Sequence, residues 1–482
     1  LQPVPHSLRT RRNRCVHAAG PAVHGPNQSR PDRRSFHDRP SPTTPINPLP
    51  NPTHNTLISL PQQGAPIGNR SEHPLHRSEP VGAHSGRDRS NHQSVRSLYI
   101  HVPFCSHKCH YCDFYSLVDT QDRQRIFADR VIRELKALSP WSEGLPLRTL
   151  FVGGGTPSLL RLDLWDRVLT ALAQHFDLSD IHTGAGEFTV ECNPESVTPE
   201  LMQRLRAGGV NRVSMGAQSF EARHLKTLER KHDPENVARA VAIAREAGIP
   251  RQSVDLIFGV PGQTLEEWDA DLGRALALGT EHVSCYNLTY EPNTAMTARL
   301  KRGEFAPADE DVEVEMYEHT RIVLAKAGLH RYEISNYARP GAEARHNLAY
   351  WRQEQWLAAG PSASGHVSHW RWKNIPRLDD YLNAPSVDGL APVTDVEAPD
   401  EARLLKETFW TGLRLAEGVA HEALLERAER TNAGARERLV RLGDRLASEA
   451  KLIADSSRWR LTDAGMLQAD AIAVDVMAAI DG

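Results

Sequence analysis

The sequence has few cysteines and no long apolar run, and both shortages narrow the kind of protein it encodes. Six cysteines occur in 482 residues, too few for a disulfide-stabilised secreted scaffold, which favours a reducing compartment. No stretch is long and apolar enough to span a bilayer as a helix, and the net charge is only −4. We therefore expect a cytoplasmic protein without a transmembrane segment, and the length allows two or three domains.

Residues 1–95 lack lysine and have one aromatic residue, Phe36, but hold 15 of the 32 prolines and 9 of the 23 histidines. Their 12 arginines and 5 acidic residues give +7, so the remaining residues carry −11. Such a composition buries too little apolar surface to offset chain entropy and predicts disorder. A transit peptide and a basic nucleic-acid-binding arm are alternatives. We favour an extension upstream of the true start, with the folded protein beginning between Ser94 and Ser97, and expect no nucleic-acid partner.

Three cysteines follow a short apolar stretch with the spacing C-x3-C-x2-C: Cys105, Cys109 and Cys112. Three thiolates can hold three irons of a [4Fe–4S] cluster, which leaves the fourth iron open for a small molecule. Zinc and plain buried thiols are the alternatives. Structural zinc usually takes four ligands in paired groups, and the other three cysteines are isolated in the sequence, although two histidines lie in the same loop. The spacing therefore favours an iron–sulfur cluster.

From residue 97 onward, apolar strand patterns alternate with helical patterns, which is typical of βα units around a parallel sheet. The predicted strands are 98–102, 148–152, 187–192, 211–216, 252–258 and 282–288. The predicted helices are 120–138, 161–175, 198–207, 235–247, 264–277 and 308–328. Six such units fit an α/β fold, a three-quarter TIM-like barrel whose chemistry lies at the C-terminal strand ends.

The pattern changes after about residue 395. Helices are predicted over 399–415, 421–429 and 436–449, a two-stranded hairpin over 452–461, and a last helix over 462–480 with Thr462 as its N-cap. This order predicts a small winged-helix-like α+β domain used for packing or interaction. The predicted organisation is therefore an extension (1–95), a barrel (96–335), a connecting region (336–395) and a C-terminal domain (396–482).

Polar residues and glycines gather where the predicted strands end. Gly-Gly-Gly-Thr-Pro follows the second strand, and its glycines would let the backbone approach a ligand closely. Single carboxylates, amides and cations follow the next strands or lie within them. These strand-end residues are Gly154, Gly155, Thr156, Glu191, Gln218, Arg230 and Asp255. Each alone is as easily a turn or a surface polar group, but all would lie at one end of the barrel.

The cysteine loop, with Tyr111 before its last cysteine, resembles the hallmark of the radical S-adenosylmethionine (SAM) superfamily. The strand-end residues, in this order, resemble its coproporphyrinogen-III-oxidase-like family over roughly residues 96–480. The resemblance implies that SAM chelates the fourth iron and that the reduced cluster cleaves it to a 5′-deoxyadenosyl radical. It also implies a set of SAM contacts, namely Tyr99, Gly154, Gly155, Thr156, Glu191, Gln218, Arg230 and Asp255.

Two features distinguish the branches of this family. The oxygen-independent coproporphyrinogen III dehydrogenases have a further cysteine two residues after the third, where this chain has Phe114. The segment His346-Asn-Leu-Ala-Tyr350-Trp351 resembles the haem-associated motif of the haem chaperones of the HemW branch. A histidine can ligate iron, and aromatic rings can pack on a porphyrin; His366 and His369 lie nearby in the sequence.

The resemblance to the HemW branch implies a chaperone that passes haem to an acceptor protein, such as a membrane respiratory protein. An oxidative decarboxylase of coproporphyrinogen III is the alternative, and a different radical SAM reaction is a third. The expected cofactors are a [4Fe–4S] cluster held by Cys105, Cys109 and Cys112, SAM, and haem contacted by His346, Tyr350 and Trp351.

Overall fold

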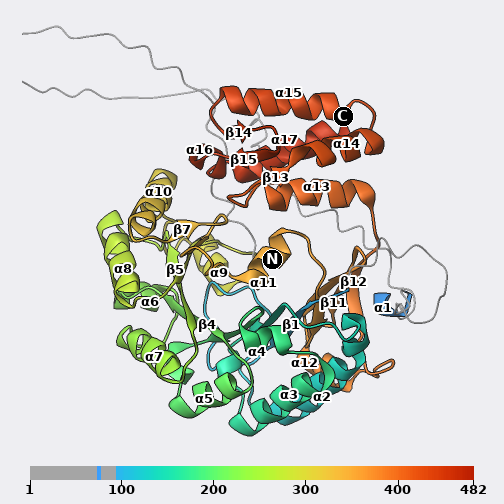
Figure 1. Cartoon of the computed structure of the whole chain (residues 1–482). Coiled ribbons are helices and arrows are strands. Elements are labelled where there is room, and N and C mark those ends of the chain that lie inside the picture. Colours follow the sequence, from blue (N-terminus) through green and yellow to red (C-terminus); the bar gives the residue numbers. More distant parts are fainter. Residues whose placement is uncertain (1–72, 78–93) are drawn as a thin grey trace, which may run out of the picture. The chain divides into compact units, whose positions relative to one another are not determined.

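The computed structural model describes residues 73–77 and 94–482 of the chain, and its centre is a nine-stranded, mostly parallel sheet (Figure 1). The first six strands of this sheet pair in sequence order and in parallel. They are β1 (Ser97–Val102), β2 (Thr149–Gly154), β3 (Glu187–Cys192), β4 (Arg212–Gln218), β5 (Arg251–Phe258) and β6 (His282–Asn287). These are the six predicted strands, each within three residues of its predicted bounds.

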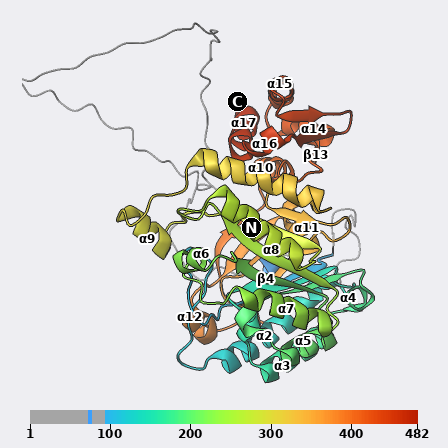
Figure 2. The ribbon, with the colours of Figure 1, turned by 90° about the vertical axis from the view of Figure 1, so that its left-hand side faces the viewer.

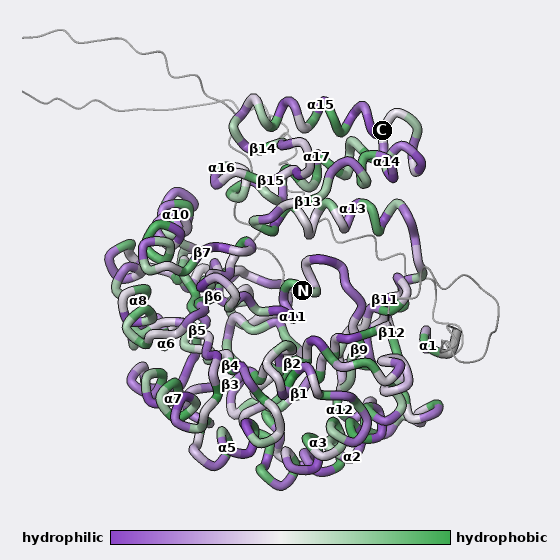
Figure 3. The backbone as a smooth tube through the Cα atoms, viewed as in Figure 1, coloured by the Kyte–Doolittle hydropathy of each residue, from purple (hydrophilic) through white to green (hydrophobic). Residues whose placement is uncertain are grey.

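Amphipathic helices cover the outer face of the sheet, because every second strand residue is apolar and faces them. On β1, for example, Leu98, Ile100 and Val102 are buried in the main hydrophobic core. Figure 3 shows hydrophobic and hydrophilic turns alternating along these helices. The predicted helices correspond to α2 (Gln124–Leu138), α3 (Leu162–His175), α5 (Pro199–Ala207), α7 (Glu235–Glu246), α8 (Leu265–Ala277) and α10 (Glu310–Lys326). Shorter helices lie between them, namely α4 (Ser179–Thr183), α6 (Ala222–Thr227) and α9 (Ala295–Lys301).

Three further strands extend the sheet beyond the six predicted ones. β9 (Leu357–Ala359) pairs in parallel with β1, while β8 (Asn336–Ala338) and β7 (His330–Arg331) continue antiparallel beside β6. Among the described residues, no pairing joins β7 to β9 at the two ends of this sheet. The fold is therefore the expected partial βα barrel, with an antiparallel addition at one edge.

The predicted connecting region, 336–395, is more structured than a linker. Besides β8 and β9, it contains α11 (Arg345–Trp351), α12 (Leu378–Asn383), β10 (Ser364–Val367) and β11 (Trp370–Asn374), and β12 (Val393–Glu397) ends it. β10, β11 and β12 form an antiparallel three-stranded sheet. These strands are too short to show a clear periodicity in the sequence.

The C-terminal part has a hydrophobic core of its own, built mainly from residues after 404. Its helices are α13 (Glu401–Gly412), α14 (His421–Thr431), α15 (Ala435–Ser448), α16 (Asp463–Met466) and α17 (Ala469–Asp481). Its strands, β13 (Val419–Ala420), β14 (Leu452–Ala454) and β15 (Arg458–Leu461), form an antiparallel sheet that contains the predicted hairpin. This arrangement agrees with a small winged-helix-like α+β domain.

The last predicted helix, 462–480, is wrong as a single element. Thr462 caps α16, because its side chain accepts a hydrogen bond from the Gly465 N–H, but the helix stops at Met466 and α17 starts at Ala469. Gly465 approaches the Lys451 carbonyl so closely that no side chain would fit there. This contact holds the first turn against the hairpin, and the chain changes direction before α17.

One short piece of the predicted extension is folded, which corrects the expectation of disorder for that piece. In α1 (Pro74–Arg77), Leu75 is buried in the main core, and the His73 ring lies 5.0 Å from that of Trp372 on β11. The rest of 1–93 lies outside the described residues, and the start predicted between Ser94 and Ser97 stays a prediction. Among the described helices, none is both long and apolar enough to cross a membrane. The domain boundaries remain predictions.

Candidate functional site

The predicted site residues lie at the end of the barrel where the parallel strands finish. In Figure 2, α6, α9 and α12 lie at this end, on the left, while α4 and α11 lie at the other. The cysteine loop follows β1, the glycine motif ends β2, and Glu191, Gln218 and Asp255 lie on β3, β4 and β5. The fold therefore brings residues that are up to 150 positions apart to one mouth.

The cysteine loop is held to the barrel from several sides. The Cys105 N–H donates to the Leu117 carbonyl at 2.9 Å, and the Met296 N–H of α9 donates to the His110 carbonyl at 2.9 Å. All three cysteines are free and partly exposed. Burial raises the pKa of the Cys112 thiol to about 11 and also raises that of Cys105. Binding of iron to these thiols would therefore release protons.

The spacing of the three thiols bears on the kind of metal that the cysteine loop suits. Within the described part of the chain, no three His, Cys, Asp or Glu side chains are grouped closely enough to hold a single ion. Each thiolate of a [4Fe–4S] cluster binds a different iron, so its cysteines lie farther apart than the ligands of one zinc ion. Three partly exposed thiols on one loop fit a cluster better than a zinc ion.

Two side chains from the predicted SAM set reach the cysteines directly. The Thr156 hydroxyl donates towards the Cys105 sulfur at 3.5 Å, and an Arg230 Nη1 donates towards the Cys109 sulfur at 3.6 Å. Arg230 also donates through Nη2 to the Gly216 carbonyl at 2.6 Å. The glycine motif, the segment after α6 and the cysteine loop therefore meet around the sulfur atoms.

The glycines of the motif are required by the protein's own packing as well as by any ligand. A Cβ on Gly155 would lie 2.8 Å from the carbonyl oxygens of Val102 and Phe104, and one on Gly154, whose φ is +106°, would strike the His101 ring. The Gly155 N–H donates to the Val102 carbonyl at 2.8 Å. The motif thus presses β2 against the start of the cysteine loop, which is a structural reason for glycine that the sequence did not reveal.

Two partly buried carboxylates lie on β3 and β5, on either side of β4. Glu191 accepts a 3.0 Å hydrogen bond from the Gly154 N–H, and Asp255 accepts from the Ser214 hydroxyl at 3.0 Å. Burial, together with the nearby Asp255, raises the pKa of Glu191 to about 7. Burial also raises the pKa of Asp255. Carboxylates kept in such surroundings are suited to receive a cationic or hydrogen-bond-donating ligand.

Gln218 lies at a distortion of β4. Its φ is +65°, a left-handed conformation that is uncommon for a residue other than glycine, and the pairing of β4 with β5 shifts register between Gly216 and Gln218. Strained backbone of this kind often marks a functional position. The distortion places Gln218 beside Gly216 and Arg230, because a Cβ on Gly216 would meet both side chains.

Tyr99 faces the barrel interior and is linked to the cysteine loop through a residue that sequence reasoning missed. The Tyr99 hydroxyl hydrogen-bonds His101 Nδ1 at 2.9 Å, and His101 Nε2 bonds the Tyr115 carbonyl at 2.8 Å. Burial lowers the pKa of His101 to about 4, so the ring is neutral near pH 7. His101 stands two residues after Tyr99, and this strand periodicity was the signal that it also points inward.

Arg212 is a second residue that the sequence analysis missed. It is buried on β4, and its positive charge partly counteracts the raised pKa values of Glu191 and Asp255. Its position two residues before Ser214 on an inward-facing row was the available signal. The interior near the two carboxylates is therefore not uniformly acidic.

The three residues predicted to contact haem divide between two places. His346 is 1% exposed; its Nδ1 bonds the Thr149 hydroxyl at 2.8 Å, and its ring stacks on Phe151 with centroids 5.2 Å apart. Tyr350 packs against His346, with centroids 4.6 Å apart. Trp351 instead belongs to the C-terminal hydrophobic core.

His346 retains one unused nitrogen. Its Nε2 is buried and has no hydrogen-bond partner among the described residues, while the Arg345 and His346 N–H groups at the start of α11 donate to the Glu187 carboxylate on β3. Burial lowers the pKa of His346 to about 3, so the ring is neutral. His366 is equally buried, whereas His369 is exposed on the following turn.

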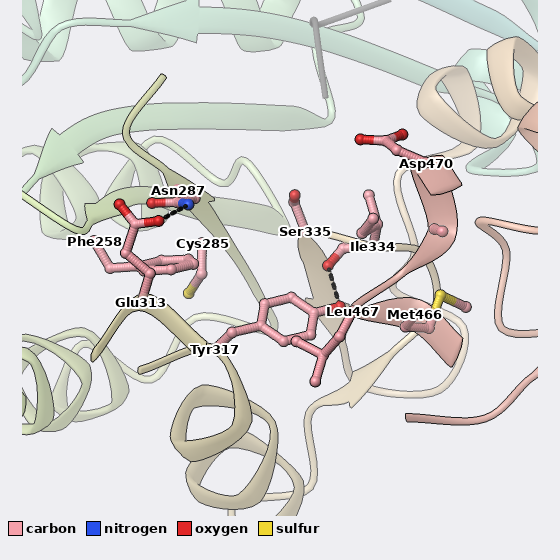
Figure 4. A pocket seen from close by; sticks show the side chains of 11 residues that line it. Phe258, Cys285, Asn287, Glu313, Tyr317, Ile334, Ser335, Met466, Leu467 and Asp470 are labelled. Atoms are coloured by element: carbon pink, nitrogen blue, oxygen red, sulfur yellow. Dashed lines mark hydrogen bonds between the residues drawn. The ribbon is translucent and has the colours of Figure 1, made fainter. Parts of the chain in front are cut away.

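A pocket away from the cysteine loop, lined in part by Cys285, lies between α10 and the junction of α16 and α17 (Figure 4). Within it the Tyr317 hydroxyl donates to the Ile334 carbonyl at 3.1 Å, and Asn287 donates to Glu313 at 3.1 Å. Met466 and Leu467 complete its apolar side. None of the predicted site residues lines this pocket, so we do not assign it to the candidate site.

The chain is similar to proteins of the radical SAM superfamily and to haem chaperones. Residues 99–275 match the radical SAM superfamily. The chain is 35% identical over 376 residues to the Heme chaperone HemW of Lactococcus lactis subsp. lactis, which covers 77% of this chain and 95% of that protein. It is 36% identical over 379 residues to the Heme chaperone HemW of Mycobacterium tuberculosis, covering 78% of this chain and 93% of that protein.

The solved structure of the coproporphyrinogen III oxidase HemN from Escherichia coli, a radical SAM enzyme, has the same fold. It matches with a TM-score of 0.69 over 80% of this chain and 91% of that chain, at 22% sequence identity. From these similarities and from the cysteine loop, the chain belongs to the radical SAM superfamily, and within its coproporphyrinogen-III-oxidase-like family it belongs to the HemW branch.

Proposed function

We propose that this protein is a cytoplasmic haem chaperone that holds a [4Fe–4S] cluster, SAM and haem, and that passes haem to an acceptor protein. The names of its HemW relatives support the haem chaperone role. The acceptor is proposed to be a haem protein such as a membrane respiratory protein.

Cys105, Cys109 and Cys112 are proposed to hold the cluster, and the strand-end residues to hold SAM. When bound, the cluster and SAM supply reductive cleavage of SAM to a 5′-deoxyadenosyl radical. The chain's own contribution is orientation. Thr156 and Arg230 donate hydrogen bonds towards cysteine sulfurs, which would stabilise thiolates, and the Glu191 carboxylate provides an acceptor at the edge of the glycine motif.

The observation that favours a chaperone over a decarboxylase is the identity of residue 114. In the dehydrogenase branch this position is a cysteine, whereas here Phe114 occupies it with 39% of its surface exposed. The loop therefore offers no fourth thiol at this place. The fold shared with HemN does not favour the decarboxylase alternative, because a fold by itself does not specify chemistry.

His346, Tyr350 and Trp351 are proposed as haem contacts, with one condition that follows from burial. The partnerless Nε2 of His346 is a neutral imidazole nitrogen, which is the form that ligates iron. Because the ring is enclosed by Phe151 and Tyr350, haem iron can reach it only after α11 moves away from β2. We therefore propose that haem binding accompanies a displacement of α11.

The test uses full-length protein with an anaerobically reconstituted cluster. Haem is titrated into wild type, His346→Ala and His366→Ala, and binding is followed by the haem absorption spectrum. We expect stoichiometric binding by wild type and by His366→Ala, and a loss of at least about tenfold in affinity for His346→Ala, because this variant would lose the side chain proposed to bind the iron.

A second assay adds coproporphyrinogen III and SAM to the same preparations. Formation of protoporphyrinogen at a catalytic rate would contradict the chaperone proposal and support a decarboxylase. Equal haem affinity in wild type and His346→Ala would be compatible with the chaperone proposal but would show that His346 is not a haem contact. Iron and sulfide analysis of each preparation shows that the cluster is present in every comparison.

A further inference from the structure

The turn that joins β7 to β8 holds a buried carboxylate, Glu333, for which the proposed function has no use. Glu333 is 1% exposed, and a carboxylate removed from water destabilises the fold unless its surroundings compensate. Two side-chain amides donate hydrogen bonds to it: Asn336 at the start of β8 and, at 3.5 Å, Asn347 on α11. Glu333 therefore connects the edge of the barrel to the helix that carries His346.

The neighbouring Tyr332 holds the same helix from the same turn. Its hydroxyl hydrogen-bonds His282 Nε2 on β6 at 3.0 Å, and it accepts from the Ala344 N–H and from the Asn347 amide, both at 3.4 Å. Asn347 is thus held by two side chains of one turn, while the adjacent His346 is held by β2 and β3. The start of α11 is therefore anchored on two sides.

The C-terminal part meets the barrel at this turn as well. Glu333 forms an isolated antiparallel bridge with Leu415, just after α13, and the Ala416 N–H donates to the Tyr332 carbonyl at 2.9 Å. The next two residues of the turn line the pocket of Figure 4 together with the start of α17. Glu333 therefore lies where three parts of the fold meet, namely the barrel edge, α11 and the C-terminal part.

The charged groups that face Glu333 are two arginines that have carboxylate partners of their own. Arg414, after α13, is fully buried; burial lowers its pKa to about 9, and the charge of Glu333 opposes this shift. Arg414 donates to Asp470 on α17, and Arg331 on β7 donates to Asp463 at 2.8 Å. Their attraction therefore offsets only part of the cost of ionising Glu333.

The other titratable groups around the turn stay neutral near pH 7. Burial raises the pKa values of the tyrosines that face it, namely Tyr286 on β6, Tyr317 on α10, Tyr332, and Tyr337 on β8. Burial lowers the pKa of His282 well below 6.5, and it raises the pKa of Glu333 from 4.5 to about 7. Of the groups named here, Glu333 is therefore the one that exchanges a proton near neutral pH.

The proton on Glu333 and the position of α11 are linked. With α11 in place, the carboxyl group is enclosed and keeps its proton up to about pH 7. Once α11 moves away, water reaches the carboxyl group and removes the cost of burial, so its pKa falls towards 4.5. The docked arrangement therefore binds this proton more tightly, and docking is most favourable below pH 4.5 and weakens as the pH rises to about 7.

We propose that Glu333 is a positioning residue for the haem site: its protonated side chain keeps α11, and with it His346, against the barrel, and release of the proton to water lets α11 move. This inference rests on the proposed haem contact at His346. Glu333 acts through Asn347, the residue after His346. The same step would provide the displacement of α11 that haem binding requires.

The test measures amide hydrogen exchange at single-residue resolution in full-length protein without haem, at about pH 5.5 and about pH 8, on either side of the Glu333 pKa. Protection factors, which remove the intrinsic pH dependence of exchange, are compared at the Arg345 and His346 N–H groups that donate to Glu187. Glu333→Gln is the variant, because glutamine keeps an acceptor oxygen and is neutral at every pH. Glu318→Gln, an exposed change on α10, is the matched control.

We expect the protection of these two N–H groups in wild type and in Glu318→Gln to fall by about tenfold or more from the lower to the higher pH. In Glu333→Gln it should stay near the wild-type value of the lower pH, because glutamine reproduces the protonated state. The Glu187 carboxylate is the same in all three proteins, so the difference between them isolates Glu333. Protection that does not depend on pH in wild type would overturn the proposal without any variant, as would an equal decrease in Glu333→Gln.

Asn347→Ala tests the contact while leaving the buried Glu333 in place. It removes the amide through which Glu333 and Tyr332 reach α11, so protection at the lower pH should fall by about tenfold, with little further decrease at the higher pH. Protection equal to that of wild type at both pH values would show that Asn347 does not transmit the effect, and the proposal would be wrong.

Haem binding separates this inference from the proposed function. The rate of haem association, measured by stopped-flow absorption, should rise with pH in wild type and in Glu318→Gln but not in Glu333→Gln. An equal rise in all three proteins would exclude Glu333 from control of haem entry and overturn the proposal. If wild type binds no haem at either pH, the chaperone function fails, while the exchange measurements still decide whether Glu333 holds α11.

Discussion

At the scale of single residues, the ionised carboxylates of Glu191 and Asp255 reduce the stability of the fold. The two partly buried carboxylates lie on β3 and β5, on either side of β4, and each raises the cost of ionising the other because like charges repel in a low dielectric. Glu191 compensates through the Gly154 N–H and Asp255 through serine hydroxyls. Proteins usually retain such destabilising pairs where a ligand uses them. We therefore expect stability and SAM binding to respond to Glu191 in opposite directions.

Replacing Glu191 with glutamine should weaken SAM binding and stabilise the unliganded fold at pH 8. The glutamine oxygen can still accept from the Gly154 N–H, but a charged acceptor is lost, which costs about 1.5–3 kcal/mol of binding, or roughly 10- to 150-fold in Kd. At pH 8 the native Glu191 is ionised against its raised pKa of about 7, and the variant avoids that penalty. Isothermal titration with SAM and urea denaturation measure the two effects.

Glu200→Gln is the control for this experiment, because Glu200 is an exposed residue on α5 after the same strand. It should leave both SAM affinity and the free energy of unfolding near the wild-type values. Unchanged SAM affinity in Glu191→Gln would remove Glu191 from the proposed SAM site.

Sequence reasoning could predict the order of the polar residues at the strand ends but not their packing. Motif spacing placed Thr156, Glu191 and Arg230 at one mouth, where the structure also has them. It could not show that His346 would be enclosed, because this depends on α11 docking against Thr149, almost 200 residues earlier. Contacts at such separation leave no periodic signal in a single sequence.

At the scale of elements, Glu134 joins α2 to the structure around β9. Its carboxylate accepts hydrogen bonds from the Gly360 N–H at 3.0 Å, the Asn374 amide at 2.7 Å and the Tyr381 hydroxyl at 2.6 Å. These partners lie after β9, at the end of β11 and on α12. One buried side chain thus connects a predicted barrel helix to a region that the sequence suggested was only a connection.

The stability contributed by Glu134 should depend on pH. Burial raises its pKa from 4.5 to about 7 in the folded protein, so the folded state binds this proton more tightly than the unfolded state does. The contribution is therefore largest below pH 4.5 and decreases as the pH rises to about 7. Glu134→Gln removes the titration, so its destabilisation relative to wild type should be smaller at about pH 8 than at about pH 5.5 by urea denaturation.

Glu437→Gln, an exposed change on α15, is the control, and its effect on the free energy of unfolding should be nearly the same at the two pH values. A destabilisation by Glu134→Gln that stays constant or grows with pH would contradict the raised pKa. In that case the hydrogen bonds, and not the proton, would dominate the role of Glu134.

At the scale of the whole described fold, α11 connects the barrel to the C-terminal hydrophobic core. Its first turn is held by Glu187 and Thr149 of the barrel, and its last residue, Trp351, is packed in the C-terminal core with Leu405 and Phe409. Any displacement of α11 that frees His346 must therefore disturb both its hydrogen bonds to the barrel and the C-terminal core. This connection gives the C-terminal part a reason to influence the proposed haem site, although it contributes none of the predicted site residues.

Replacing Trp351 with alanine should loosen α11 at both ends. Loss of a buried tryptophan typically costs about 3–5 kcal/mol, and because α11 has only seven residues, its first turn should also open more often. We expect faster amide hydrogen exchange in α13 and also at the Arg345 and His346 N–H groups that donate to Glu187.

Trp459→Ala is the matched comparison, since Trp459 is buried in the same core but on β15. It should accelerate exchange in the C-terminal core and leave these two N–H groups protected. If both variants open the start of α11 equally, or neither does, α11 does not couple the barrel to the C-terminal core, and the displacement required for haem must arise within the barrel alone.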